Sequence, residues 1–234
     1  MTWTTITLLL ALGAPPPSGE EVLARVDSIL SPEHYSAEIH MTARRPDGET
    51  REYAYLVAKS GDDNLKLSFT APTTLAGHAA LRRGSELWRY VPSLKRAMRI
   101  SSRADFESGD FRNADVLRLR LARDYAVKAM RADGELLVLE LTTRSDDAGY
   151  DAMTLWVQAK NFMPVKEELF GASGKLLRVL ECSAPKDFSG HRAPSLLKMT
   201  NMVARGRTTD MEIVSLKREE RMPDSTFAVE ALGR

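Results

Sequence analysis

The chain has 234 residues, with 33 basic and 32 acidic side chains and a formal net charge of +1. This balance excludes a protein that holds nucleic acid by neutralising phosphates, because such proteins need a clear basic excess. A hydrophobic fraction of 43% and a charged fraction of 28% are ordinary for a folded protein. The length suits one large β-rich domain or two small ones. A single cysteine, Cys182, excludes an intramolecular disulfide and a cysteine-based zinc site.

The first residues are typical of an export signal. The short apolar run Ile6–Leu12 is followed by small residues and a proline cluster, and it is too short to span a bilayer. No Lys or Arg precedes the run, which departs from the usual signal pattern, and no Cys follows it to carry a lipid anchor. We predict a signal peptide over residues 1–14, a short Pro-rich segment over 15–19 and one domain over 20–234, exported to the periplasm.

The first element after the prolines is a helix. Ser18 and Glu21 have the spacing of a capping box, and apolar residues then recur on one face as far as Leu30. Ser31 and Pro32 end the helix.

A period of two then replaces the helical period. Residues 34–44 alternate apolar and polar side chains, Pro46-Asp47-Gly48 has turn chemistry, and a partner strand is predicted over 49–59. Four further strands are predicted over residues 65–70, 78–83, 86–91 and 95–101.

The 86–91 strand carries bulky side chains on both faces. Leu87 and Val91 lie on one face, and Trp88 and Tyr90 lie on the other. Apolar residues on both faces of a strand indicate that both faces are covered. We therefore expect packing on each side of this part of the sheet.

The pattern breaks between Ser102 and Asn113. Two aromatic residues and one glycine follow no period there, and we interpret this stretch as a loop that crosses the structure. A helix is predicted next, from Asn113 as its N-cap to Tyr125.

The second half of the chain is again strands. They are predicted over about 126–132, 135–143, 152–158, 164–170, 175–183, 194–203 and 207–218. A polar loop over 184–193 separates two of them, and a small turn at 223–227 closes the chain. Short turns can join all neighbouring strands, so the sheet is expected to be antiparallel.

No catalytic constellation accompanies these elements. Four histidines lack metal-ligand spacing, and phosphate-loop, nucleophile-elbow and zinc-helix motifs are missing from the sequence. Asp146–Asp151 superficially resembles a calcium loop but lacks its ligand order and its distal Glu. We predict no enzyme, no cofactor and no metal. Residues 82–123 hold eleven basic and five acidic side chains, which favours either an anionic partner or a solvated outer face.

Several short motifs together resemble the outer-membrane lipoprotein-sorting proteins, a family of periplasmic carriers of the LolA/LolB type. The matching pieces are Phe69-Thr-Ala-Pro72, Leu75-Ala-Gly77, Leu87-Trp-Arg-Tyr-Val-Pro92, Arg96-Ala-Met-Arg-Ile100, Ser108-Gly-Asp-Phe111, Ala114-Asp-Val-Leu117, Leu155-Trp-Val157, the 164–170 strand with Gly174-Lys-Leu176, and Pro223–Phe227. The resemblance covers nearly all of the chain after the proline cluster and rests on many small matches.

The resemblance implies a mainly β (α+β) fold. Its centre would be a strongly curved antiparallel sheet, an unclosed half-barrel, with one or two helices lying as a lid over the concave face. It also implies an apolar cavity for an acyl chain, lined by six candidate residues: Phe69, Trp88, Tyr90, Met98, Leu117 and Leu121. Plain core packing explains each of these residues equally well.

Two functions follow from this interpretation. The first is an exported carrier, expected to be a monomer, that holds a lipid or a lipoprotein acyl chain and passes it toward the outer membrane. The alternative is a periplasmic accessory subunit that docks to a membrane transporter of the resistance-nodulation-division type without carrying lipid. A hydrolase would need a nucleophile and a base in the cavity, and the sequence offers no such pair.

Overall fold

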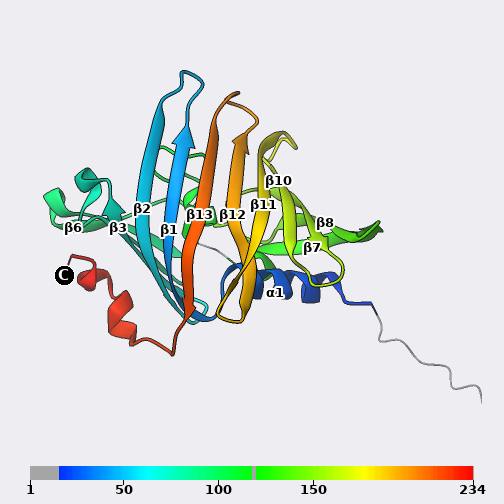
Figure 1. Ribbon diagram of the computed structural model, residues 1–234, viewed down its shortest axis with the longest axis horizontal. Coiled ribbons are helices and arrows are strands. Elements are labelled where there is room, and N and C mark those ends of the chain that lie inside the picture. The colour runs from blue at the N-terminus through cyan, green and yellow to red at the C-terminus, as the bar shows by residue number, and fades with distance from the viewer. Residues whose placement is uncertain (1–15, 118–119, 234) are drawn as a thin grey trace, which may run out of the picture.

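The computed structural model describes residues 16–117 and 120–233, so the predicted signal peptide over 1–14 lies outside the described residues. One strongly curved sheet dominates the fold (Figure 1). Its thirteen strands are β1 (His34–Arg44), β2 (Thr50–Ser60), β3 (Asn64–Ala71), β4 (Ala79–Arg83), β5 (Glu86–Val91), β6 (Arg96–Arg99), β7 (Tyr125–Asp133), β8 (Leu136–Thr143), β9 (Ala152–Gln158), β10 (Pro164–Phe170), β11 (Leu176–Phe188), β12 (His191–Asn201) and β13 (Thr208–Arg218).

The strand order explains the shape of the molecule. The order is β6-β5-β4-β3-β2-β1-β13-β12-β11-β10-β9-β8-β7, and every neighbouring pair is antiparallel. The first and last strands therefore pair at the centre, while β6 and β7 form the two edges. These edges do not meet, which confirms the predicted unclosed half-barrel with few helices.

Helix α1 (Gly19–Leu30) begins as predicted. The Ser18 hydroxyl accepts a hydrogen bond from the Glu21 backbone N–H, and the Glu21 carboxylate accepts one from the Ser18 backbone N–H at 2.7 Å. The helix buries Val22, Leu23 and Val26 against the concave side of the sheet. In Figure 1 it passes behind the lower ends of β12 and β11.

The predicted helix over 113–125 is wrong in its extent. The described residues form two short helices, α2 (Asn113–Leu117) and α3 (Leu121–Asp124), and Tyr125 already belongs to β7. A contact distant in sequence gives α3 its own start, because the Asp27 carboxylate of α1 accepts hydrogen bonds from the Leu121 and Ala122 backbone N–H groups at 2.9 and 3.0 Å.

Two smaller expectations also need correction. Asn113 is not an N-cap, since it lies within α2 and its side-chain amide donates to the Ser101 carbonyl. The predicted polar loop over 184–193 is a hairpin of β11 and β12, in which Lys186 lies opposite Ala193. Ser189 and Gly190 both have positive φ, as a two-residue hairpin turn requires, and two prolines had obscured the strand period.

A second, smaller core lies on the convex face of β4 and β5. Ala79 and Leu81 pack there against Phe227 and Leu232 of the C-terminal segment, which contains η3 (Asp224–Phe227) and η4 (Val229–Ala231). Figure 1 shows this segment, in red, lying alongside the β3–β6 part of the sheet. The expectation that both faces of this region are covered is therefore confirmed.

The Phe227→Ala variant should lose about 3 to 5 kcal/mol of unfolding free energy, because it empties a side-chain site that is almost completely buried in this second core. Urea denaturation measures the loss. An unchanged transition midpoint would show that the C-terminal segment does not hold the convex face.

Candidate functional site

The connection between β6 and β7 fills the concave face. We call residues 100–124, of which 118–119 lie outside the described part, the crossing segment. Its Phe106 and Phe111 side chains are 2% and 1% exposed. Phe106 stacks on Phe69 of β3, with ring centroids 5.8 Å apart, and meets Tyr55 of β2 edge-on at 5.9 Å. The prediction of a loop that crosses the structure is confirmed.

A buried carboxylate ties the crossing segment to the centre of the sheet. Asp110 is completely buried, and its carboxylate accepts hydrogen bonds from the Thr209 hydroxyl and the Asn201 side-chain amide, both at 2.9 Å. The Arg207 guanidinium lies 3.0 Å from the same carboxylate. These partners come from β12, β13 and the turn between them, so one side chain bonds the segment to strands about ninety residues away.

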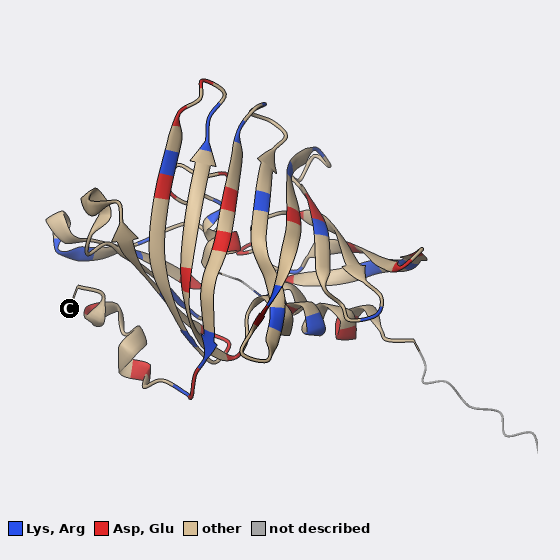
Figure 2. Cartoon of the chain, viewed as in Figure 1, with Lys and Arg blue, Asp and Glu red and all other residues tan. Residues whose placement is uncertain are grey.

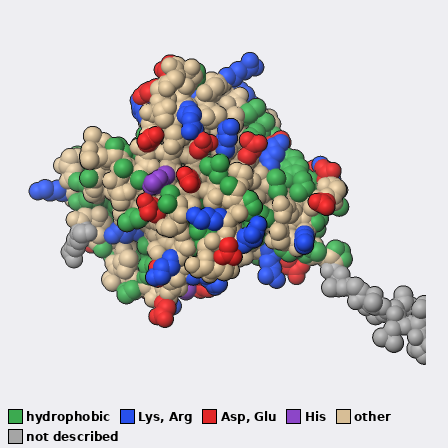
Figure 3. All heavy atoms as spheres, viewed as in Figure 1, with side chains coloured by type: hydrophobic (Ala, Val, Ile, Leu, Met, Phe, Trp, Pro, Cys, Tyr) green, Lys and Arg blue, Asp and Glu red, His purple; other side chains and the backbone are tan. Residues whose placement is uncertain are grey.

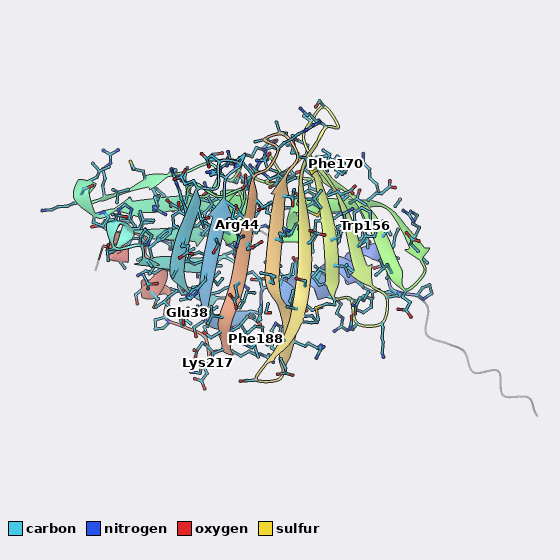
Figure 4. All side chains as sticks on the ribbon, turned by 45° about the horizontal axis from the view of Figure 1, so that its top comes forward. Glu38, Arg44, Trp156, Phe170, Phe188 and Lys217 are labelled. Atoms are coloured by element: carbon cyan, nitrogen blue, oxygen red, sulfur yellow. The ribbon has the colours of Figure 1, made fainter. Side chains whose placement is uncertain are left out.

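Two arginines of the β1–β2 hairpin hold the same stretch from the rim. Arg45 donates to the Ser108 carbonyl, and Arg51 donates to the Ser108 hydroxyl at 2.6 Å. Arg44 of the same hairpin points outward and pairs with Asp210 instead (Figure 4). The Arg51 contact is exposed and the Arg45 contact is partly buried, and as two ordinary polar contacts they can open at a modest cost in free energy.

A second buried network holds α2 against the other half of the sheet. The Tyr150 hydroxyl donates to the Asp115 carboxylate at 2.9 Å, and Arg178 of β11 donates to the Tyr150 oxygen at 3.2 Å. Burial raises the pKa of Asp115 and of Tyr150.

Between these anchors the packed interior leaves a small cavity. It offers about 70 Å³ to water-sized groups and is lined by α1, α2, α3 and strands β9 to β12. That volume holds a few water molecules and is far below the roughly 300 Å³ of a small-molecule pocket. A larger ligand can enter this cavity only if the crossing segment moves.

Comparison with known proteins decides which proteins share this arrangement. A model for a family described only as uncharacterized protein matches residues 61–234. Among solved structures, the chain is similar to a LolA superfamily protein from Nitrosomonas europaea, at 25% identity and a TM-score of 0.82, with 91% of this chain and 98% of that chain covered. The chain belongs to the matched family and has the LolA fold.

Two other solved structures share this fold. A putative outer membrane lipoprotein-sorting protein domain from Vibrio parahaemolyticus is 22% identical with a TM-score of 0.75, covering 92% of this chain and 96% of that one. A DUF1329 family protein from Desulfovibrio piger is 20% identical with a TM-score of 0.79, covering 92% and 97%. No curated protein sequence matches the chain significantly. The resemblance indicated by the sequence motifs is thus confirmed.

The six predicted site residues of this LolA-like chain divide between the two faces of the sheet. Phe69 lies in the concave aromatic cluster, and Met98 lies on the same face, opposite Arg89, whose guanidinium stacks over Phe69 at 4.4 Å. Leu117 is fully buried in the concave core, and Leu121 packs partly buried against it and lines the cavity.

Trp88 and Tyr90 lie on the opposite, convex face. The cross-strand pairs Leu81–Trp88 and Ala79–Tyr90 place both side chains in the core beneath the C-terminal segment. We predicted that Trp88 and Tyr90 line the cavity, and their placement on the convex face does not match this prediction. Strand alternation separates these two residues from Phe69, and the sequence alone cannot say which face of the sheet is concave.

Sequence reasoning did not single out Tyr55, Phe106, Phe111 or Asp110 as site residues. For Phe106, Asp110 and Phe111 the signal was available in the aperiodic stretch 102–113, which holds two aromatic residues and a Ser-Gly-Asp motif. Aromatic side chains in an otherwise polar loop need a buried surface, which the concave face provides for this stretch.

The acidic stretch Asp146–Asp151 serves as a structural contact. The Asp151 carboxylate accepts two hydrogen bonds from the Arg103 guanidinium, both at 3.0 Å, which lowers the pKa of Asp151.

Within residues 16–117 and 120–233, no group of three or more acidic, histidine or cysteine side chains is placed to hold a metal ion. No helix in the same described residues is long and apolar enough to cross a membrane.

The basic excess over residues 82–123 is partly compensated by carboxylates outside this segment. Arg103 pairs with Asp151, Arg120 with Asp62, and Arg123 with Asp63. Figures 2 and 3 show both signs of charge interspersed over the viewed face of the molecule. This pattern favours an ordinary solvated surface over a basic rim for anionic lipid.

An ionic cluster closes one end of the concave face. We define it as Asp27, Lys59, Arg82, Arg120 and Asp124. Burial, with the nearby Arg82 charge, lowers the pKa of Lys59 to about 8, and burial with the Arg123 charge lowers the pKa of Arg82 to about 10. Burial raises the pKa of Asp27 and of Asp124. All four pKa shifts have the same main cause, which is that burial keeps these ionisable groups away from water.

The Lys59→Met variant tests this burial. The Lys59 ammonium donates to the Ser31 and Pro32 carbonyls at 3.2 and 2.6 Å. Its pKa is about 8 in the folded protein and near 10.5 in the unfolded chain, so the unfolded chain binds more protons between these values. Wild-type stability, relative to Lys59→Met, should therefore rise by about 3 kcal/mol across that pH window.

Urea denaturation at successive pH values measures this difference. Lys128→Met on β7 is the control, because Lys128 is exposed and its substitution should leave the pH dependence unchanged. Parallel pH curves for the wild type and Lys59→Met would contradict a buried ammonium.

Proposed function

We propose that this protein is an exported, non-catalytic carrier that takes an acyl chain of a lipid or lipoprotein onto its concave face and passes it toward the outer membrane through the periplasm. One observation carries the proposal. The crossing segment, which is not a strand of the sheet, fills the concave face and packs its aromatic side chains against the strands there. The likeness to a LolA superfamily protein and to a putative lipoprotein-sorting domain supports this class of cargo.

The mechanism is competition for one apolar surface. An acyl chain entering beside Tyr55 and Phe69 gains about 0.8 kcal/mol for each buried CH2 group, and it displaces Phe106, which loses its own burial. The net affinity is the difference between these two terms. A carrier built in this way binds its cargo moderately and can yield it to an acceptor that has no competing segment.

The polar contacts at the rim set how often the crossing segment leaves. Removing both donors to Ser108, as in the Arg45→Ala/Arg51→Ala variant, should raise the rate of lipid uptake about tenfold, since two hydrogen bonds at about 0.7 kcal/mol each no longer hold the segment. Stopped-flow fluorescence with a fluorescent fatty acid measures the rate.

Arg44→Ala is the matched control for this experiment. Arg44 lies on the same hairpin but pairs with Asp210 on the outer side, so its loss should leave the uptake rate unchanged. Equal rates in the wild type and the double variant would mean that the rim contacts do not control access.

The Phe106→Ala variant separates competition from plain core packing. It should lower the unfolding free energy by about 3 to 5 kcal/mol. It should also raise the affinity for a fluorescent fatty acid, because displacing the segment then exposes less buried apolar surface. Phe227→Ala, whose ring is buried in the convex core, should destabilise the protein similarly without raising affinity. Equal affinities in wild type and Phe106→Ala would contradict the competition.

The carrier function itself is tested by incubating the purified protein with phospholipid vesicles and recording native mass spectra. Lipid bound one-to-one to the protein is the expected result. A lipid-free protein that instead captures an inner-membrane transporter would favour the alternative role of a docking subunit.

A further inference from the structure

The ionic cluster lies on the concave side of the sheet, next to the small cavity. Asp27 and Asp124 line the cavity together with Arg120. Lys59 on β2 and Arg82 on β4 lie behind them, within electrostatic range of Asp27 and Asp124 respectively. The aromatic cluster around Phe69 lies on the same concave face, on β2 and β3, so the interior has an apolar part and an ionic part.

The buried charges of this cluster cancel. Lys59, Arg82, Asp27 and Asp124 are each at most 6% exposed, and they make two cations and two carboxylates. Arg120, the more exposed member of the cluster, pairs with Asp62 and approaches Asp27 at 3.8 Å, and its neighbour Arg123 pairs with Asp63 and Asp124. Part of the cluster would therefore repel a ligand with a net charge of either sign.

The cluster also contains polar atoms that the fold leaves unpaired. Arg82 donates one hydrogen bond, to the Asp62 carbonyl, but its Nε and Nη1 atoms have no hydrogen-bond partner among residues 16–117 and 120–233. Within the same residues, the Asp124 Oδ2 atom and the Ser31 hydroxyl are also buried without a partner. Arg82 and Asp124 interact electrostatically, and the other Asp124 oxygen accepts a hydrogen bond from Arg123 at 3.1 Å. The unpaired atoms of Arg82 and Asp124 favour a ligand that supplies an acceptor and a donor together.

We propose that the ionic cluster is a subsite for a zwitterionic ammonium–phosphate group, the head group of a phosphoethanolamine amphiphile. Its phosphate oxygens accept from Arg82, and its ammonium donates to Asp124. This inference rests on the proposed carrier function and names the polar end of its cargo. The charge balance makes the preference selective, because a plain anion faces Asp27 and Asp124 while a plain cation faces Lys59 and Arg82.

The test measures dissociation constants by isothermal titration calorimetry for probes that share one chain. The probes are myristoyl lysophosphatidylethanolamine, myristoyl lysophosphatidylglycerol and myristate, with free phosphoethanolamine as the probe without a chain. The full-length protein should bind the zwitterionic lysolipid at least about tenfold more tightly than either anionic probe, the amount expected of one charge-assisted hydrogen bond. Free phosphoethanolamine should bind far more weakly than the lysolipid.

Two variants assign the preference to its two ends. Asp124→Asn should lose the preference for the zwitterion over the anionic lysolipid, and Arg82→Gln should weaken binding of both phospholipids while leaving myristate binding unchanged. Arg131→Gln and Asp133→Asn, at an exposed ion pair on β7, are the controls and should change nothing. Circular dichroism checks folding, and if Arg82→Gln does not fold, the isosteric Asp124→Asn variant carries the test.

The possible results separate this inference from the proposed function. If all three chain-bearing probes bind equally well, the head-group subsite is wrong and the carrier function stands. If no chain-bearing probe binds, both proposals fall. If free phosphoethanolamine binds as tightly as the lysolipid, the site recognises a soluble molecule and the assignment to a lipid is overturned.

Discussion

The order of the strands imposes the constraint on which the rest of this structure depends. Because β1 pairs with β13 at the centre of the sheet, the consecutive strands β6 and β7 lie at opposite edges. The chain between them must span the full width of a curved sheet, and the concave side is the short path that also buries its aromatic side chains. The crossing segment is therefore a consequence of the topology, and the interior surface is covered by a connection that no strand pairing holds in place.

Two kinds of contact hold that connection, and they differ in strength. The buried bonds of Asp110 and of the Tyr150–Asp115–Arg178 network fix its two halves, while the contacts of Arg45 and Arg51 lie at the exposed rim. The stretch around Phe106 is held by the rim contacts at Ser108 and by the Arg89–Glu107 ion pair. The ionic cluster adds a second constraint, since its balanced buried charges make the apolar interior polar at one end.

Much of the fold could be predicted from sequence, because local signals there agree with tertiary packing. The Ser18–Glu21 capping box marks the start of α1, and β5, β9 and β10 have the predicted bounds, since alternating side chains report a strand directly. The candidate site was predicted only in part. Phe69, Leu117 and Leu121 lie in or beside the concave core, whereas Trp88 and Tyr90 lie beneath the C-terminal segment on the other face.

By itself, the sequence determined which segments are strands, that short turns join them in antiparallel pairs, and that β5 is covered on both sides. These properties depend on near neighbours in the chain, through side-chain alternation and turn chemistry. Only the tertiary structure decided which face is concave, where the 113–125 region divides, and that Asp110 joins the crossing segment to Thr209. Each of these depends on groups distant in the chain, such as Asp27 bonding the start of α3, and no local pattern records such a partner.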